Sequence, residues 1–174
     1  MDRAIWHFCR GLAFAARGNP AAAEAEKSEL DALAQSGEAK ELNEPTFPAT
    51  DTLTIASHWL AGKVAGARGD SRSMISQLEA AAKAMDEMPY MEPAYWPFPV
   101  RPTLGAAFLR SGDPKEAERV FREDLKQWPR NAWGLFGLEQ TLRQQGRPQN
   151  AESVHREFLE TWKYADVKLE LDHF

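Results

Sequence analysis

The chain has 174 residues, of which 43% are hydrophobic and 10% aromatic, and this composition excludes a disordered segment and allows a substantial buried core. The net charge of −5 argues against non-specific binding to nucleic acid and to anionic membranes. The single cysteine, Cys9, excludes an internal disulfide and a cysteine-based zinc cluster, and no apolar run approaches the ~20 residues needed to span a bilayer. We therefore expect a cytoplasmic protein without membrane insertion, cofactor or metal.

The N-terminal segment has an amphipathic helical pattern, and Asp2 is its candidate N-cap. Part of this segment recurs further along the chain. The sequence HFCRGLAFAARGNP, from His7, and the sequence HWLAGKVAGARGDS, from His58, share His, Gly and Ala-Arg-Gly in register. This self-similarity predicts that the chain is built from repeated structural units.

Two later segments repeat at one spacing. The interval from Gly112 to Gly146 is 34 residues, and the interval from Ala117 to Ala151 is the same. Four glycines suit left-handed helix ends and are each followed by residues that begin another helix: Gly18, Gly69, Gly112 and Gly146. Other small residues allow neighbouring helices to approach closely: Gly11, Gly62, Gly105, Ala23, Ala117 and Ala151.

The third repeat resembles the tetratricopeptide repeat family in seven residues: Leu104, Gly105, Phe108, Gly112, Ala117, Phe121 and Pro129. The resemblance implies an all-α fold, a tetratricopeptide-like α-solenoid of about four helical hairpins in a single superhelical domain over residues 1–174. We predict repeats at residues 4–35, 54–85, 99–130 and 132–163. Residues 88–138 are also similar to the C-terminal region of larger bacterial tetratricopeptide proteins. This likeness implies that further repeats precede the chain.

Two insertions separate the repeats. The first, residues 36–52, is predicted to be a polar surface loop that contains Pro45 and Pro48. The second, residues 86–98, is rich in prolines, which favour an extended path. We predict that it is an ordered wedge whose aromatic side chains pack back over neighbouring hairpins: Tyr90, Tyr95, Trp96 and Phe98. The tail, residues 164–174, is expected to extend as a short strand or to cap the last repeat.

The tetratricopeptide resemblance implies a concave groove lined by the first helix of each hairpin. Together with the wedge, these helices would present aromatic and basic residues: Phe8, Trp59, Lys63, Trp96, Arg101, Arg110, Trp133, Phe136, Gln140 and Arg143. Aromatic and arginine side chains are enriched where proteins bind partners. We expect a non-enzymatic protein–protein interaction module that binds a peptide or partner segment in this groove. The alternative is that Trp59, Trp133 and Phe136 only pack between helices.

A second function remains open, namely a small-molecule or metal site or an enzyme that uses a pocket around His7, His58, Trp59 and Arg101. No His-Glu-x-x-His motif occurs, and neither histidine has an acidic residue one helical turn away, so packing is favoured for both. Cys9 is interpreted as a small buried filler. A further alternative is that the array stacks on upstream repeats or on a second copy of itself.

Overall fold

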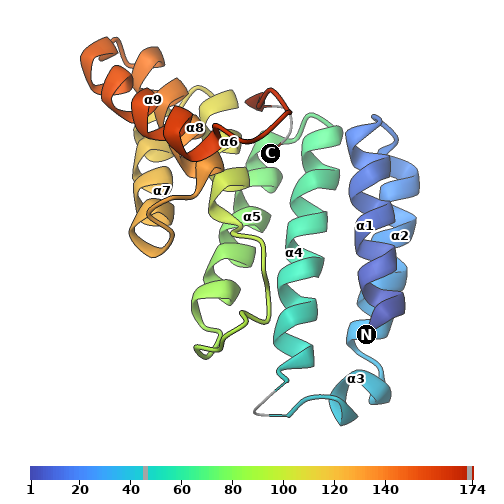
Figure 1. Ribbon diagram of the computed structural model, residues 1–174. Helices are drawn as coiled ribbons and strands as arrows, with labels where there is room; N and C mark the ends of the chain where they lie inside the picture. The colour runs from blue at the N-terminus through green and yellow to red at the C-terminus, as the bar shows by residue number, and fades with distance from the viewer. Residues whose placement is uncertain (45–46, 172–173) are drawn as a thin grey trace. The chain divides into compact units, whose positions relative to one another are not determined.

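The computed structural model describes residues 1–44, 47–171 and 174, and these residues form nine α-helices and no β-strand (Figure 1). The chain divides into two compact units, unit 1 (residues 1–100) and unit 2 (residues 101–174). Unit 1 contains α1 (Asp2–Ala16), α2 (Pro20–Ala34), α3 (Gly37–Glu41), α4 (Ala49–Ala67) and α5 (Ser71–Asp86). Unit 2 contains α6 (Arg101–Arg110), α7 (Pro114–Gln127), α8 (Ala132–Gln144) and α9 (Pro148–Trp162). The predicted all-α fold of helical hairpins is confirmed.

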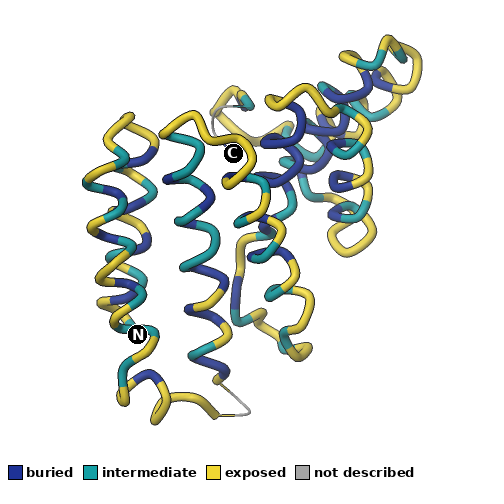
Figure 2. Tube along the Cα trace, turned by 180° about the vertical axis from the view of Figure 1, so that it is seen from behind, coloured by how far each residue is buried: buried dark blue, intermediate teal, exposed yellow. Residues whose placement is uncertain are grey.

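The central helix of unit 1 is α4, which packs against α1, α2 and α5. Because neighbouring helices lie on several sides of α4, buried residues occur on more than one of its faces, from Ala49 to Val64 (Figure 2). In unit 1, one hairpin consists of α1 and α2, and the other consists of α4 and α5. In unit 2 the corresponding pairs are α6 with α7 and α8 with α9, and α7 also packs against α8.

The turn inside each hairpin follows the sequence prediction. The four turn glycines have φ angles between +69° and +82°, the left-handed region that favours glycine: Gly18, Gly69, Gly112 and Gly146. The next helix then begins with a capping side chain in three of the hairpins. The side chains of Asn19, Asp70 and Asp113 accept hydrogen bonds from backbone N–H groups in the first turns of α2, α5 and α7.

Glycines inside the helices make room for large side chains of neighbouring helices, as the sequence predicted for Gly11 and Gly105 but not for Gly137. A Cβ atom on Gly11 would lie 2.6 Å from a Leu60 methyl carbon in unit 1. In unit 2 the Phe121 ring lies against two glycines. A Cβ on Gly105 would be 2.6 Å from this ring, and one on Gly137 would be 2.2 Å from it. Phe121 is fully buried, so its ring sets the spacing of α6, α7 and α8.

The polar surface loop predicted for residues 36–52 is partly helical, so that prediction is wrong in part. Residues Gly37–Glu41 form α3, and α4 begins at Ala49. The Ser36 hydroxyl accepts a hydrogen bond from the Ala39 N–H at 3.2 Å and so caps α3. Pro48 is buried and precedes α4, whereas Pro45 lies outside the described residues.

Two predictions about the first helix are also wrong. Asp2 is the first residue inside α1 rather than its cap, and Met1 occupies the N-cap position without a side-chain hydrogen bond. Cys9 is exposed rather than buried. Successive residues on a helix point about 100° apart, and the neighbouring Phe8 takes the inward direction.

We predict that Gly137→Ala destabilises the protein by about 1–3 kcal/mol, because the added methyl group would overlap the Phe121 ring. Gly37→Ala is the control, since a Cβ there meets no heavy atom within 4 Å, and its effect should stay within about 0.5 kcal/mol. Urea unfolding followed by tryptophan fluorescence measures both free energies. Equal effects of the two substitutions would show that Phe121 is not confined by this glycine.

Candidate functional site

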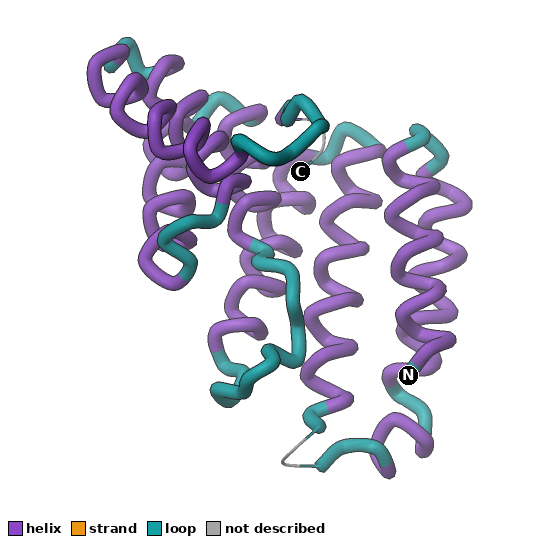
Figure 3. The backbone as a smooth tube through the Cα atoms, in the orientation of Figure 1, coloured by secondary structure: helices purple, strands orange, loops and turns teal. Residues whose placement is uncertain are grey.

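Three of the predicted groove residues form one aromatic cluster in unit 1. Phe8 from α1, Trp59 from α4 and Trp96 from the connection between α5 and α6 have ring centroids 5.4–6.0 Å apart. Trp96 is only 5% exposed. The backbone of the connection thus returns along unit 1 (Figure 3). The indole ring of Trp96 lies against Phe8 of α1 and Trp59 of α4.

The rest of the proline-rich connection departs from the prediction. Tyr90 and Phe98 are 85% and 63% exposed, so they do not pack over the hairpins as expected. Tyr95 is half-buried. Three residues of an extended proline-rich segment make about one turn, so side chains two positions apart point in different directions. Trp96 points inward, and Phe98 therefore points away. Trp96 therefore carries the contact, and its indole Nε1 has no hydrogen-bond partner among the described residues.

A second aromatic group lies on α8 in unit 2. The ring of Phe174 lies 5.1 Å from that of Trp133 and 6.1 Å from that of Phe136, between ring centroids. It also lies 6.4 Å from the ring of Phe121. The C-terminal residues thus cover the α8 residues that the sequence analysis assigned to the groove. We call Trp133, Phe136 and Phe121 the α8 aromatic face.

Backbone contacts hold the same tail. The Nη1 atom of Arg110 donates a hydrogen bond to the backbone oxygen of Leu171 at 3.1 Å. The indole Nε1 of Trp162 donates to the backbone oxygen of Val167 at 2.7 Å, which turns the chain back after α9. Leu169 is 4% exposed. The described residues of the tail form no strand, and the Leu171 oxygen also accepts a hydrogen bond from the Phe174 N–H at 3.4 Å, which closes a tight turn. Of the two predicted conformations, these residues therefore fit the cap better than the strand.

Two further arginines of the predicted groove, Arg101 and Arg143, form ion pairs inside unit 2. Arg101 Nε lies 3.7 Å from Glu123 Oε2. Arg143 donates to Glu139 at 2.8 Å and lies 3.8 Å from Glu152 on α9. Their charges are therefore engaged within the α6–α7 and α8–α9 hairpins. The two remaining predicted residues, Lys63 and Gln140, are half-buried on α4 and α8.

The two histidines of the alternative pocket bond within their own hairpins. His7 Nδ1 lies 2.7 Å from Glu26 Oε2, and His58 Nδ1 lies 2.9 Å from Gln77 Oε1. The partner is 19 residues ahead in each case, on the second helix of the hairpin, so a search one turn away on the same helix does not find it. Arg101 belongs to unit 2. Among the residues with described positions, no group of three metal-ligating side chains forms a metal site.

Sequence analysis missed a buried carboxyl group beneath α8. Asp124, in the last turn of α7, is fully buried, and its Oδ2 accepts a hydrogen bond from Asn131 Nδ2 at 2.8 Å. Burial raises the pKa of Asp124 to about 6, against the opposing effects of the Asn131 hydrogen bond and the Arg101 charge. Gly134 leaves the space for it, since a Cβ there would be 2.3 Å from Oδ2.

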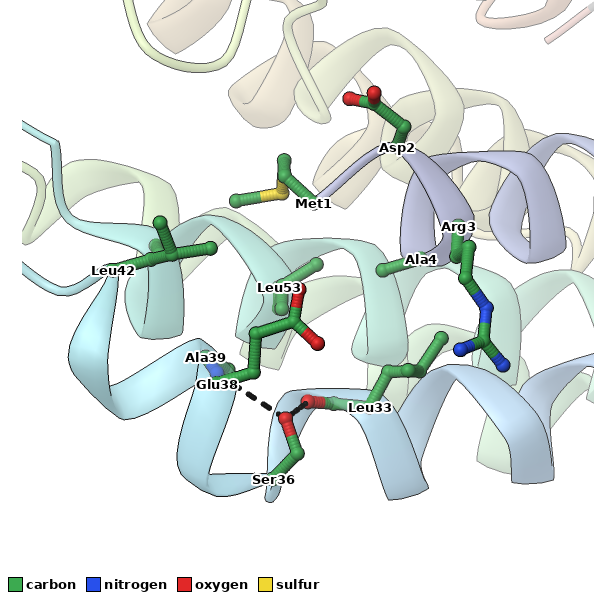
Figure 4. A pocket seen from close by; sticks show the side chains of 11 residues that line it. Met1, Asp2, Arg3, Ala4, Leu33, Ser36, Glu38, Ala39, Leu42 and Leu53 are labelled. Carbon is green, nitrogen blue, oxygen red and sulfur yellow. Dashed lines mark hydrogen bonds between the residues drawn. The ribbon is translucent and has the colours of Figure 1, made fainter.

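A small cavity of about 210 Å³ lies in unit 1 where the ends of α1 and α2 meet α3 and α4. Leu33, Leu42 and Leu53 give it an apolar wall, and Arg3 and Glu38 stand at its edge (Figure 4). Sequence analysis did not find it, because α3, which closes one side, was predicted to be a loop. Its volume is below the ~300 Å³ at which small-molecule pockets begin.

Across the described part of the chain, none of the helices combines the length and the apolar character that crossing a membrane requires.

The paired helices and glycine turns define a protein of the helical-repeat class. Residues 104–132 match the sequence profile of the tetratricopeptide repeat family. The fold is similar to that in the crystal structure of MamA protein, with a TM-score of 0.54, 13% sequence identity, and coverage of 97% of this chain and 99% of that one. Comparison with curated proteins finds no match. The family match thus covers one repeat, residues 104–132, and the likeness to MamA protein shows a common fold.

We predict that Asp124→Asn changes how stability depends on pH. Because the pKa of Asp124 is about 6 in the folded chain and ordinarily 3.8, the folded state binds this proton more tightly. Its stabilising contribution is therefore complete below about pH 4 and is lost as the pH rises to about 6, by ~1.4 kcal/mol per pH unit. The variant should gain roughly 2–3 kcal/mol relative to the unsubstituted chain over that interval.

Urea unfolding at several pH values between about 4 and 7 measures this difference, in which the contributions of the other carboxyl groups cancel. Asp166→Asn, at an exposed position in the tail, is the matched control. Stability curves for Asp124→Asn and the unsubstituted chain that run parallel would contradict the prediction.

Proposed function

We propose that this tetratricopeptide repeat protein is a non-enzymatic interaction module that binds an extended segment of a partner protein on the α8 aromatic face. Tetratricopeptide repeats are interaction modules, and this proposal adds where the partner lies. One observation carries it. The face holds residues of the chain's own tail, through ring contacts to Phe174 and a hydrogen bond from Arg110 to the Leu171 backbone oxygen.

These two kinds of contact suit peptide recognition. Trp133 and Phe136 are half-buried and rigid, and aromatic pairs in edge or offset geometry contribute about 0.5–1.5 kcal/mol beyond their burial. Burial of one Phe side chain contributes about 1.5–3 kcal/mol. Ordering a bound segment costs about 1–2 kcal/mol per residue in backbone entropy. One anchor of this kind therefore supports weak, reversible binding.

The aromatic cluster in unit 1 suits a structural role better. The Trp96 ring packs against Phe8 and Trp59. Trp96 belongs to a connection that is attached to α5 at one end and to α6 at the other. Displacing it would require the whole connection to move. Of the ten residues predicted for the groove, we therefore assign partner contact first to Trp133, Phe136 and Arg110.

The enzyme and small-molecule alternative has less support. His7 and His58 bond to Glu26 and Gln77 of their own hairpins, so neither is presented as an acid–base pair. The cavity beside α3 is about 210 Å³. The cytoplasmic location stays a prediction from the sequence.

We predict that Trp133→Ala weakens peptide binding at least about tenfold, because it removes a central aromatic contact. Peptides selected from a random phage-displayed library on the full chain are synthesised, and their affinities are measured by fluorescence anisotropy. Arg110→Ala, at an exposed position, should weaken binding several-fold without affecting the fold.

Trp128→Ala is the matched control, since this tryptophan is 41% exposed at the end of α7 and makes no ring contact with the α8 aromatic face in the described residues. Its affinity should stay within about twofold of the unsubstituted chain. Peptides that bind Trp133→Ala and Arg110→Ala as tightly as the unsubstituted chain would refute the proposed site.

A further inference from the structure

One side of α1 is exposed along the whole helix. The helix packs against α2 and α4, and its buried residues form one line along it: Ala4, Phe8, Gly11 and Ala15. Because successive residues of a helix point about 100° apart, a second line of residues lies on the opposite side. Its five residues, the last of which is the C-cap, are all exposed: Asp2, Trp6, Cys9, Ala13 and Arg17. We call them the α1 outer face.

Trp6 is the large side chain of this face, and its contacts fix its orientation. The indole is 51% exposed, and the Arg10 guanidinium carbon lies 4.2 Å from its ring centroid. The His7 ring meets the indole edge-on, with 4.8 Å between the ring centroids. Both neighbours are held by one buried carboxylate, since Arg10 Nη2 lies 3.2 Å from Glu26 Oε1 and His7 Nδ1 lies 2.7 Å from Glu26 Oε2. A tryptophan that is already ordered loses little conformational entropy when it binds, which favours a role in contact with a partner.

The internal repeat shows what kind of structure packs on such a face. His7 and His58 are equivalent positions 51 residues apart, and each bonds to a side chain 19 residues further along the chain. The same offset relates the α1 outer face to a line of residues on α4. The equivalents of its first four residues are buried or half-buried there: Leu53, Ser57, Leu60 and Val64.

On α4 this line packs against the hairpin that precedes it. The Leu60 side chain lies so close to Gly11 of α1 that a Cβ atom on the glycine would be 2.6 Å from a methyl carbon. The Ser57 hydroxyl donates a hydrogen bond to Asp31 of α2 at 2.5 Å. In Figure 1, α4 accordingly lies between the α1–α2 hairpin and α5. The corresponding side of a first helix in this fold is therefore a surface on which other helices pack.

We propose that the α1 outer face is a self-association surface, on which α1 of a second copy of this chain packs antiparallel. A two-fold axis that passes between Cys9 and Arg10 relates the two copies. This inference goes beyond the proposed function, because it concerns unit 1 and requires no peptide on the α8 aromatic face.

The α1 outer face is complementary to itself in this arrangement. Antiparallel pairing about the axis sets Asp2 of each copy opposite Arg17 of the other, so that opposite charges meet twice. It also sets Trp6 of each copy opposite Ala13 of the other, so that a large side chain meets a small one. A parallel pairing in register would set each of these side chains against its own kind. The antiparallel pairing also places the positive end of each helix dipole beside the negative end of the other.

The size of the face predicts a weak and reversible dimer. A helix of 15 residues is about 22 Å long. One pair of such helices is a contact at or below the small end of stable interfaces, which bury about 1,200–2,000 Å². We therefore expect a dissociation constant in the micromolar range or above, so that the chain is monomeric when dilute and associates when concentrated.

Sedimentation velocity of the full chain in reducing buffer measures this association over a concentration series. W6A should raise the dissociation constant at least about tenfold, because each dimer contains this tryptophan twice. W128A is the matched control, since Trp128 is 41% exposed in unit 2, and its dissociation constant should stay within about twofold of that of the unsubstituted chain. Circular dichroism and thermal melting verify that both variants are folded.

Charge reversal tests the antiparallel register. D2R and R17D should each weaken association several-fold, because each substitution sets like charges opposite one another at both ends of the helix pair. The double variant D2R/R17D again pairs opposite charges. Its dissociation constant should return to within about twofold of that of the unsubstituted chain.

Cys9, the single cysteine of the chain, reports the position of the axis. Two helices whose axes lie about 8–10 Å apart bring facing Cα atoms near the two-fold axis to about 4–6 Å, a distance that a disulfide spans. Oxidation with diamide should therefore link the copies through Cys9 at concentrations at which they associate. Below the dissociation constant, W6A should slow this linkage at least about tenfold at equal concentration, because fewer copies are paired.

A chain that stays monomeric at every concentration up to its solubility limit would overturn the inference. A dimer that forms equally well in folded W6A would also overturn it. So would a dimer that the double charge reversal does not restore, or one that oxidation does not link through Cys9. Peptide binding at the α8 aromatic face is measured separately, so the proposed function stands or fails independently of this dimer.

Discussion

The Phe121 ring between Gly105 and Gly137 is the contact on which unit 2 depends. The ring comes from α7 and is fully buried. It occupies the space in which a Cβ atom would lie at Gly105 of α6 and at Gly137 of α8. The same ring also lies 6.4 Å from Phe174, so the residue that sets the helix spacing forms the floor of the α8 aromatic face. The packing of the core and the shape of the candidate binding surface therefore have one cause, and any change in the helix spacing alters the surface.

Both units cover an aromatic face with a segment of the same chain. In unit 1 the indole of Trp96 lies on Phe8 and Trp59, and in unit 2 the ring of Phe174 lies on α8. Large exposed apolar surfaces on a soluble domain promote unwanted association, and covering them removes that risk. The two covers differ in their attachment. The connection to Trp96 joins two helices, whereas the residues that contact α8 follow the last helix, α9.

The sequence was sufficient for the hairpins, because each depends on local signals: a glycine in the left-handed region, a capping side chain, and a small residue at each close approach. It was not sufficient for the irregular segments. Cys9 and Phe98 were predicted to face inward, but Phe8 and Trp96, which lie one and two positions before them, take the buried positions. The contact of the tail with α8 joins residues far apart in sequence, and no periodic pattern reports such a contact.

Asp124 shows why a costly buried acid is compatible with this site. Its carboxyl group accepts only from the NH₂ end of the Asn131 amide, so it fixes which way that amide points. The amide oxygen is then directed to the start of α8, where it accepts a hydrogen bond from the Trp133 N–H at 3.2 Å. Two hydrogen bonds thus connect the buried carboxyl to the backbone of the residue that contacts Phe174. A neutral apolar side chain at position 124 would avoid the desolvation penalty, but it would not fix the orientation of the Asn131 amide. The acid therefore costs stability and, in return, holds the first turn of α8 in the position from which Trp133 reaches the α8 aromatic face.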